Sequence, residues 1–130
     1  MEINFTTKKG EVIDITEKIE ELVRRTGVTG IINVFAPHAT GILMLGENEP
    51  HIAKDYLRVM ENLVPTQNNW EHDKIDNNAA AHLRSALFGV STTIPVINGK
   101  LQLGTWQRIL FVEVEGDRHR RVMLTWVGSK

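Results

Sequence analysis

A helical face carrying polar side chains is the first candidate for chemistry in this chain. Across residues 77–87, spacings of four and three residues place Asn78, His82 and Ser85 on one side of a helix. An amide, an imidazole and a hydroxyl can together orient a polar substrate and transfer a proton. The alternative interpretation is a polar face that only meets solvent.

Three histidines could bind a metal ion if the fold brings them together. His38 lies between two apolar segments, His72 lies in a polar stretch, and His82 belongs to the helix. Three neutral imidazole nitrogens suit Zn²⁺ with an open coordination position, and the chain has no cysteine to offer a thiolate. Asp76 and Glu47 are candidates for partner carboxylates, or for ligands of a harder ion such as Mg²⁺. The alternatives are a turn histidine satisfied by backbone and an exposed loop histidine.

A second polar motif, Gly104-Thr105-Trp106-Gln107, follows a short apolar segment. Thr105 and Gln107 offer hydrogen-bonding groups suited to phosphate or amide recognition, and the glycine lets backbone approach a ligand closely. Trp106 is interpreted as a core or interface aromatic, because tryptophan buries a large area. Arg118 follows a Gly-Asp turn, where a guanidinium can hold phosphate. A solvated charge cluster is the alternative for this arginine.

The hydrophobic pattern predicts the elements that must position these residues. Helical spacing predicts three helices, at residues 15–23, 52–63 and 79–87. Apolar runs predict about eight strands, which include residues 29–36, 40–46, 92–97, 101–103, 109–114 and 122–127. The unbroken apolar run at 42–45 predicts a strand buried on both faces, and Asn98-Gly99 predicts a tight hairpin turn. The balance predicts an α+β fold, mainly an antiparallel sheet or sandwich, whose edges a small oligomer would cover.

Size and composition restrict the class of protein. A chain of 130 residues with 42% hydrophobic residues fits a single domain, residues 1–130, with a real core. The 15 basic and 16 acidic residues nearly balance and form no basic block, so we expect no nucleic-acid partner. The chain lacks the pattern of a signal peptide, and no apolar run approaches the roughly 20 residues of a membrane span. We therefore expect a cytoplasmic protein with no membrane partner.

The motifs also carry a family resemblance over nearly the whole chain. Its most specific part is the segment 91–99, Ser-Thr-Thr-Ile-Pro-Val-Ile-Asn-Gly, followed by the motif at 104–107. Supporting matches are Pro37-His38-Ala39-Thr40, Glu47-Asn48-Glu49-Pro50, His72, Asp76-Asn77-Asn78-Ala79, His82 and Arg118. On these residues the chain resembles the YjbQ-like family, also labelled the secondary thiamine-phosphate synthase family. Two positions depart from the family pattern: Ala39 replaces a usual hydroxyl residue, and Ala80 replaces a frequent acidic residue.

The resemblance implies a compact α+β fold and a homotrimer with polar residues near the subunit boundaries. It also implies a weak thiamine-phosphate synthase activity in some members. In that reaction a pyrimidine pyrophosphate loses pyrophosphate, and a thiazole phosphate captures the pyrimidine carbon. Stabilising the departing pyrophosphate requires arginine, backbone N–H groups or a metal.

Two hypotheses from different classes follow. The leading one is a trimeric enzyme acting on a phosphorylated small molecule, with Zn²⁺ or another divalent metal as the expected cofactor. Its catalytic residues would be His38, His82 and Asp76, and its metal ligands His38, His72 and His82. Its substrate would be oriented by Thr40, Asn78, Ser85, Thr105, Gln107 and Arg118. The alternative is a trimer that binds a metal or phosphorylated metabolite without catalysis; in a third interpretation, the histidines only hold the trimer together.

Overall fold

Two antiparallel sheets and a set of helices make up the structure, a computed structural model that describes residues 1–128. The larger sheet has the order β1-β8-β3-β5-β6, with bounds Glu2–Thr7, Arg118–Gly128, Gly30–Phe35, Ser91–Ile97 and Lys100–Leu101. The smaller has the order β2-β7-β4, with bounds Val12–Asp14, Arg108–Glu113 and Gly41–Gly46. The helices are α1 (Thr16–Thr26), α2 (Pro50–Leu63), α3 (Ala79–Phe88) and the 3₁₀ helix η1 (Glu71–Lys74). The predicted α+β class is confirmed.

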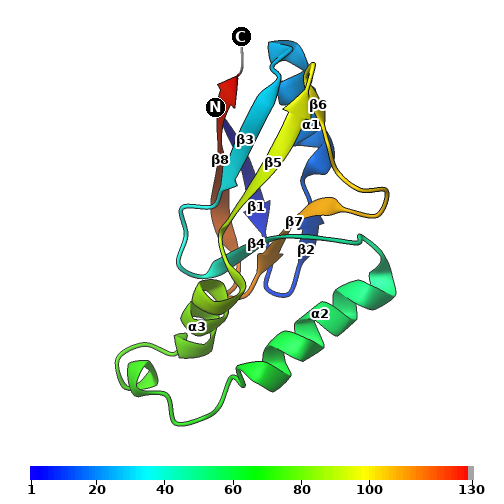
Figure 1. The fold of residues 1–130 in the computed structure, drawn as a ribbon. Coiled ribbons are helices and arrows are strands. Elements are labelled where there is room, and N and C mark those ends of the chain that lie inside the picture. Colours follow the sequence, from blue (N-terminus) through cyan, green and yellow to red (C-terminus); the bar gives the residue numbers. More distant parts are fainter. Residues whose placement is uncertain (129–130) are drawn as a thin grey trace.

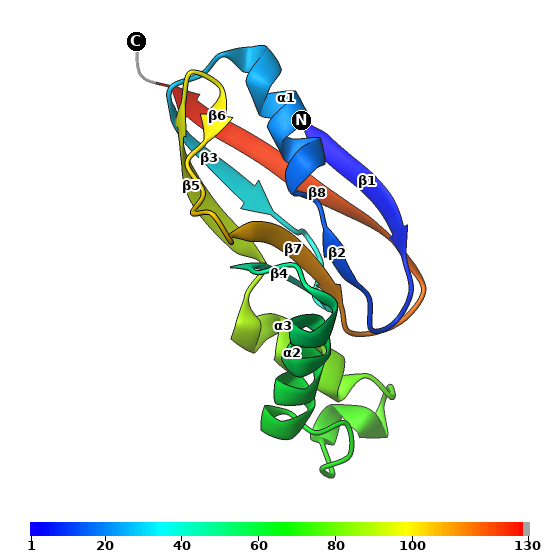
Figure 2. The same ribbon diagram turned by 90° about the vertical axis from the view of Figure 1, so that its right-hand side faces the viewer.

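The two sheets stack on one another, and α2 and α3 lie on the far side of the smaller sheet (Figures 1 and 2). The main core lies between the sheets and is closed by α1, with Ile19, Val34, Phe111 and Val122 among its buried members. A second core lies beneath the outer helices and joins Ile42 and Val112 to Met60 of α2 and Ala81 of α3. The smaller sheet is therefore covered on both faces.

Strand β4 confirms the prediction of a strand buried on both faces. Ile42 belongs to the core beneath α2 and α3, whereas the next residue, Leu43, belongs to the core between the sheets. Successive strand residues point to opposite faces, so a strand in the middle layer needs apolar residues at consecutive positions. The Asn98-Gly99 turn is confirmed as well, with positive φ at both residues (49° and 74°).

The ladder between β4 and β7 sets the distance between two polar regions. Gly41 pairs with Glu113 at one end of this ladder, and Gly46 pairs with Arg108 at the other. Five residue steps of about 3.4 Å separate the two ends by roughly 17 Å. Polar side chains gather beyond each end, so the smaller sheet acts as a rigid spacer between them.

The first and last strands of the larger sheet pair with one another. Strand β1 lies antiparallel to β8 with Glu2 opposite Met123 and Thr7 opposite Arg118. The ion pair from Arg121 to Glu2 lies along this ladder. Within residues 1–128, every helix is too short or too polar to cross a membrane.

Candidate functional site

Polar residues from four separate segments meet beyond the Gly41–Glu113 end of the ladder. We call this region the histidine end and define it by His38, Thr40, His72, Asn78, His82, Glu113, Glu115, Arg118 and Arg120. His72 Nε2 lies 2.9 Å from Asn78 Oδ1, and Asn78 Nδ2 donates to Glu115 Oε1 at 2.7 Å. Arg118 forms an ion pair with the same carboxylate oxygen at 3.3 Å. The four segments are the loop 37–40, η1, α3 with the preceding Asn78, and the hairpin formed by the end of β7, the turn after it and the start of β8.

The Glu115 carboxylate is held in its ionised form. Burial opposes ionisation, but hydrogen bonds from the Thr40 hydroxyl and the Asn78 amide outweigh it. The positive charges of Arg118 and Arg120 act in the same direction, so the pKa of Glu115 lies below its ordinary value. Glu115 is therefore a fixed negative charge that accepts hydrogen bonds from several sides.

A buried ion pair anchors this cluster to both sheets. Glu113 of β7 is fully buried and accepts two bonds of 2.6 Å from Arg120 of β8. The Thr7 hydroxyl of β1 donates to Glu113 at 2.6 Å, and Arg120 also donates to the Thr40 carbonyl and hydroxyl oxygens. Burial raises the pKa of Glu113, but the hydrogen bonds from Arg120 and Thr7 lower it by more, so the net shift is downward. Every charge in this pair has its partners.

The three predicted metal-binding histidines occupy the same end, but they do not form one group. The rings of His72 and His82 lie edge to face, with centroids 5.0 Å apart. His38 instead points to β8, where its Nε2 lies 3.0 Å from both the carbonyl oxygen and the amide nitrogen of Arg121. Burial lowers the pKa of His38 and favours its neutral form. No set of three metal-ligating side chains comes together within residues 1–128 of one chain.

Two further predicted residues are engaged inside the chain. The Ser85 hydroxyl is buried and donates to the Gly41 carbonyl at 2.6 Å, which ties α3 to the first residue of β4. The Asp76 carboxylate accepts from the Asn77 amide at 2.8 Å and is exposed. It lines a small pocket of about 140 Å³ that is also lined by Lys9, Asp73, Asn78 and Glu115.

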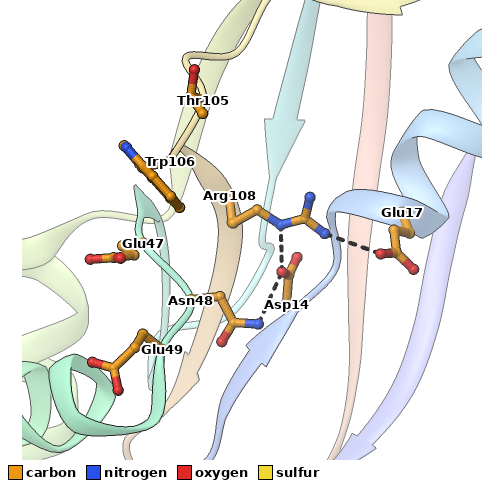
Figure 3. A pocket seen from close by; sticks show the side chains of 8 residues that line it. All are labelled: Asp14, Glu17, Glu47, Asn48, Glu49, Thr105, Trp106 and Arg108. Carbon is orange, nitrogen blue, oxygen red and sulfur yellow. Dashed lines mark hydrogen bonds and ion pairs between the residues drawn. The ribbon is translucent and has the colours of Figure 1, made fainter.

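The opposite end of the ladder holds an open cleft of about 610 Å³. Eight residues line it, and we call this region the cleft end (Figure 3): Asp14, Glu17, Glu47, Asn48, Glu49, Thr105, Trp106 and Arg108. Arg108 donates to Asp14 at 2.6 Å and to Glu17 at 3.4 Å, and Asn48 donates to Asp14 at 3.2 Å. Burial opposes ionisation of Asp14, but the bond from Arg108 keeps its pKa below the ordinary value. Four carboxylates against one guanidinium make the cleft acidic.

Trp106 stands on the surface of the cleft end. Its side chain is 73% exposed, so the interpretation as a core aromatic is wrong, while an interface role stays a prediction. The Gln107 side-chain oxygen accepts from the Gly104 amide at 2.8 Å and closes the loop that carries the indole. The predicted substrate residues Thr105 and Gln107 therefore lie at the opposite end of the ladder from Thr40, Asn78 and Arg118.

Sequence reasoning missed the two glutamates that organise the histidine end. Glu113 interrupts an otherwise apolar strand, and Glu115 follows two residues later. A lone carboxylate in a buried strand requires a cationic partner, and Arg120 lies on the other side of a short turn. This was the available signal for the buried pair.

The fold and its polar ends define a class of α+β proteins with two stacked antiparallel sheets and an outer helical layer. A family model described as "UPF0047 protein YjbQ-like" matches residues 1–129, and the chain belongs to this family. A UPF0047 protein of Methanothermobacter thermautotrophicus is 42% identical over 125 residues, covering 95% of this chain and 87% of that protein.

Two solved structures agree with this assignment. A hypothetical protein from Aeropyrum pernix K1 superposes with a TM-score of 0.89 at 40% identity, covering 99% of each chain. A YbjQ-like protein of unknown function from Sulfolobus solfataricus gives a TM-score of 0.91 at 31% identity, covering 99% of this chain and 97% of that one. The architecture is therefore shared along the whole chain.

Proposed function

We propose that this chain is a transferase acting on phosphorylated small molecules, with a weak activity of the secondary thiamine-phosphate synthase type. The observation that carries the proposal is the hydrogen-bonded convergence of His72, Asn78, Glu115 and Arg118 at the histidine end. These residues come from segments that lie apart in the sequence, and the polar cluster exceeds what packing of the two sheets requires.

The chemistry proposed at this end is displacement of pyrophosphate. The bond between the pyrimidine methylene carbon and the pyrophosphate oxygen breaks, its electron pair leaves with pyrophosphate, and the thiazole nitrogen bonds to the carbon. We assign binding of the departing oxyanion to Arg118; 48% of its side chain is exposed, and Lys9 lines the neighbouring pocket, which supports this role. His72 and His82 offer imidazoles for proton transfer to the leaving group.

Assembly into a homotrimer is part of the proposal. The outer face of the larger sheet leaves Ile31, Phe35, Met123 and Val127 exposed, which supports contact with another chain. A cytoplasmic location is also part of the proposal. Zn²⁺ or another divalent metal stays part of the proposal, although residues 1–128 of one chain bring no three metal-ligating side chains together.

Turnover by a His82→Ala variant tests the proposal. Release of pyrophosphate is measured from a pyrimidine pyrophosphate supplied with a thiazole phosphate. We expect His82→Ala to abolish turnover with an unchanged circular dichroism spectrum. His51→Ala is the matched control and should keep wild-type turnover, because His51 is an exposed histidine beside Glu49.

Other outcomes select between the alternatives. Undiminished turnover in His82→Ala would refute the catalytic role. Tight binding of phosphorylated ligands without product in the wild type favours a non-enzymatic binding protein. Dissociation of a wild-type trimer by His82→Ala, seen by size-exclusion chromatography, favours an interface network. Elemental analysis of the wild type and of a His38/His72/His82→Ala variant tests the metal: the prediction expects about one zinc per chain, lost in the variant.

A further inference from the structure

We infer that Glu115 is a positioning residue that acts through Asn78 to fix His72 in one tautomer. In this tautomer Nε2 carries the hydrogen and Nδ1 is the acceptor that the site offers to a ligand. The inference rests on the proposed function in one respect, namely that His72 takes part in the proposed reaction. It adds which atom of the ring is presented and which residue decides it.

The first step concerns the direction of the Asn78 amide. A side-chain amide has a donor end and an acceptor end, whereas an ionised carboxylate only accepts. The Glu115 side chain is 17% exposed and has the Arg118 charge beside it. The amide must therefore turn its NH₂ group toward Glu115, which is the orientation with Nδ2 at 2.7 Å from Oε1. The opposite orientation would place two acceptor oxygens against each other.

The second step passes this direction to the imidazole. With its NH₂ group on Glu115, Asn78 presents Oδ1 to His72 Nε2 at 2.9 Å. A carbonyl oxygen only accepts, so Nε2 must carry the hydrogen. In a neutral imidazole the other nitrogen is then the acceptor. Within residues 1–128, His72 Nδ1 has no hydrogen-bonding partner, so its lone pair is available to a ligand.

The third step explains why Glu115, and not Asp76, has this role. Asp76 lies closer in sequence to His72, but its carboxylate accepts from the amide of Asn77. Glu115 is tied to the buried ion pair, because its backbone N–H donates to Glu113 Oε2 at 3.0 Å. A chain of hydrogen bonds that begins at the buried ion pair thus fixes the orientation of His72. Preorganisation of this kind holds a ring nitrogen in place before a ligand arrives.

Long-range proton–nitrogen NMR correlations of ¹⁵N-labelled protein report the tautomer directly. Spectra are recorded without substrate at a pH of about 8, where an ordinary imidazole is neutral. We expect His72 of the wild type to show a protonated Nε2 and an unprotonated Nδ1. In Glu115→Ala the amide is free to turn, so His72 should shift toward a mixture of both tautomers.

A charge-reversed variant makes the test stronger. Lysine in Glu115→Lys donates, so the Asn78 amide should turn over, present Nδ2 to His72 and convert the ring to the Nδ1-protonated tautomer. Asp76→Ala is the control variant and should leave the His72 signals unchanged. The signals of the exposed His51 should stay the same in every variant. If Glu115→Lys does not fold, Glu115→Ala and the wild type still decide.

Two results would overturn the inference. One is an Nδ1-protonated His72 in the wild type, and the other is a His72 tautomer unchanged in a folded Glu115→Lys variant. Because no substrate enters these spectra, they decide the tautomer even if the proposed transferase activity is absent. Where turnover is found, Glu115→Ala should lower it without loss of the fold.

Discussion

The two ends of the β4–β7 ladder use similar residue types, but one end buries its charged groups and the other leaves them exposed. At the histidine end, the carboxylates of Glu113 and Glu115 are buried or nearly so, and arginine, threonine or asparagine partners hold each of them. At the cleft end, the indole of Trp106 stands in solvent, and the Arg108 guanidinium is 31% exposed. One end is fixed before any ligand arrives, whereas the other is open.

This difference indicates a division of labour. Buried charges with all partners in place hold a geometry, because moving any one of them leaves another unpaired in a medium of low dielectric. Exposed charges and an exposed aromatic ring can change partners at little cost. We therefore expect substitutions at the histidine end to lower the free energy of unfolding strongly, and substitutions at the cleft end to change it little.

The largest expected difference is between two arginines. Arg120→Met leaves Glu113 buried without its cation and should lower the free energy of unfolding by about 3–5 kcal/mol. Arg108→Met removes a partly exposed partner and should cost about 1 kcal/mol or less. Urea denaturation followed by circular dichroism measures both. Equal losses for the two variants would remove the distinction between the ends.

The second-largest effect is expected from acid, which should reduce the stability that the histidine end contributes to the fold. Glu113 and Glu115 have pKa values below the ordinary 4.5, so their stabilisation is complete above that pH. It is lost as the pH falls from 4.5 through their depressed values in the folded protein. Glu115→Gln should be less stable at neutral pH and lose less stability on acidification. The measurement is the free energy of unfolding against pH, with the exposed Glu71→Gln as control.

The smallest effect is expected at the exposed indole. Trp106→Ala should change the free energy of unfolding by no more than about 0.5 kcal/mol, because little of the side chain is buried within the chain. The same urea titration, run at several protein concentrations, detects any role in assembly. A loss that grows as the protein concentration rises would place Trp106 in a contact between chains and contradict the description of the cleft end as open.

The elements of the fold could be predicted from the sequence because their signals are local. The run at 42–45 indicated a middle strand, and Asn98-Gly99 indicated a hairpin by its need for positive φ. The pairing of β1 with β8 has no such signal, since it depends on partners at opposite ends of the chain.

The site was harder to predict than the fold. Helical spacing correctly put His82 and Ser85 on one helix, but Asn78 lies just before its first residue. The spacing also could not say that Ser85 faces Gly41 inside the chain. The role of Glu115 depends on how the β7–β8 turn lies against α3, and this is a matter of tertiary packing. Likewise, Thr105 is separated from Thr40 by the length of a ladder that only the strand register defines.

The β1–β8 pairing has a consequence for how the chain reaches its fold during synthesis. Glu2 and Arg121, which form an ion pair on this ladder, lie 119 residues apart. Strand β1 must therefore wait unpaired until β8 has left the ribosome, and the smaller sheet waits nearly as long, because its central strand β7 lies just before β8 in the chain. Closure of the larger sheet is then a late event, and chains halted before β8 would expose β1 to intermolecular pairing.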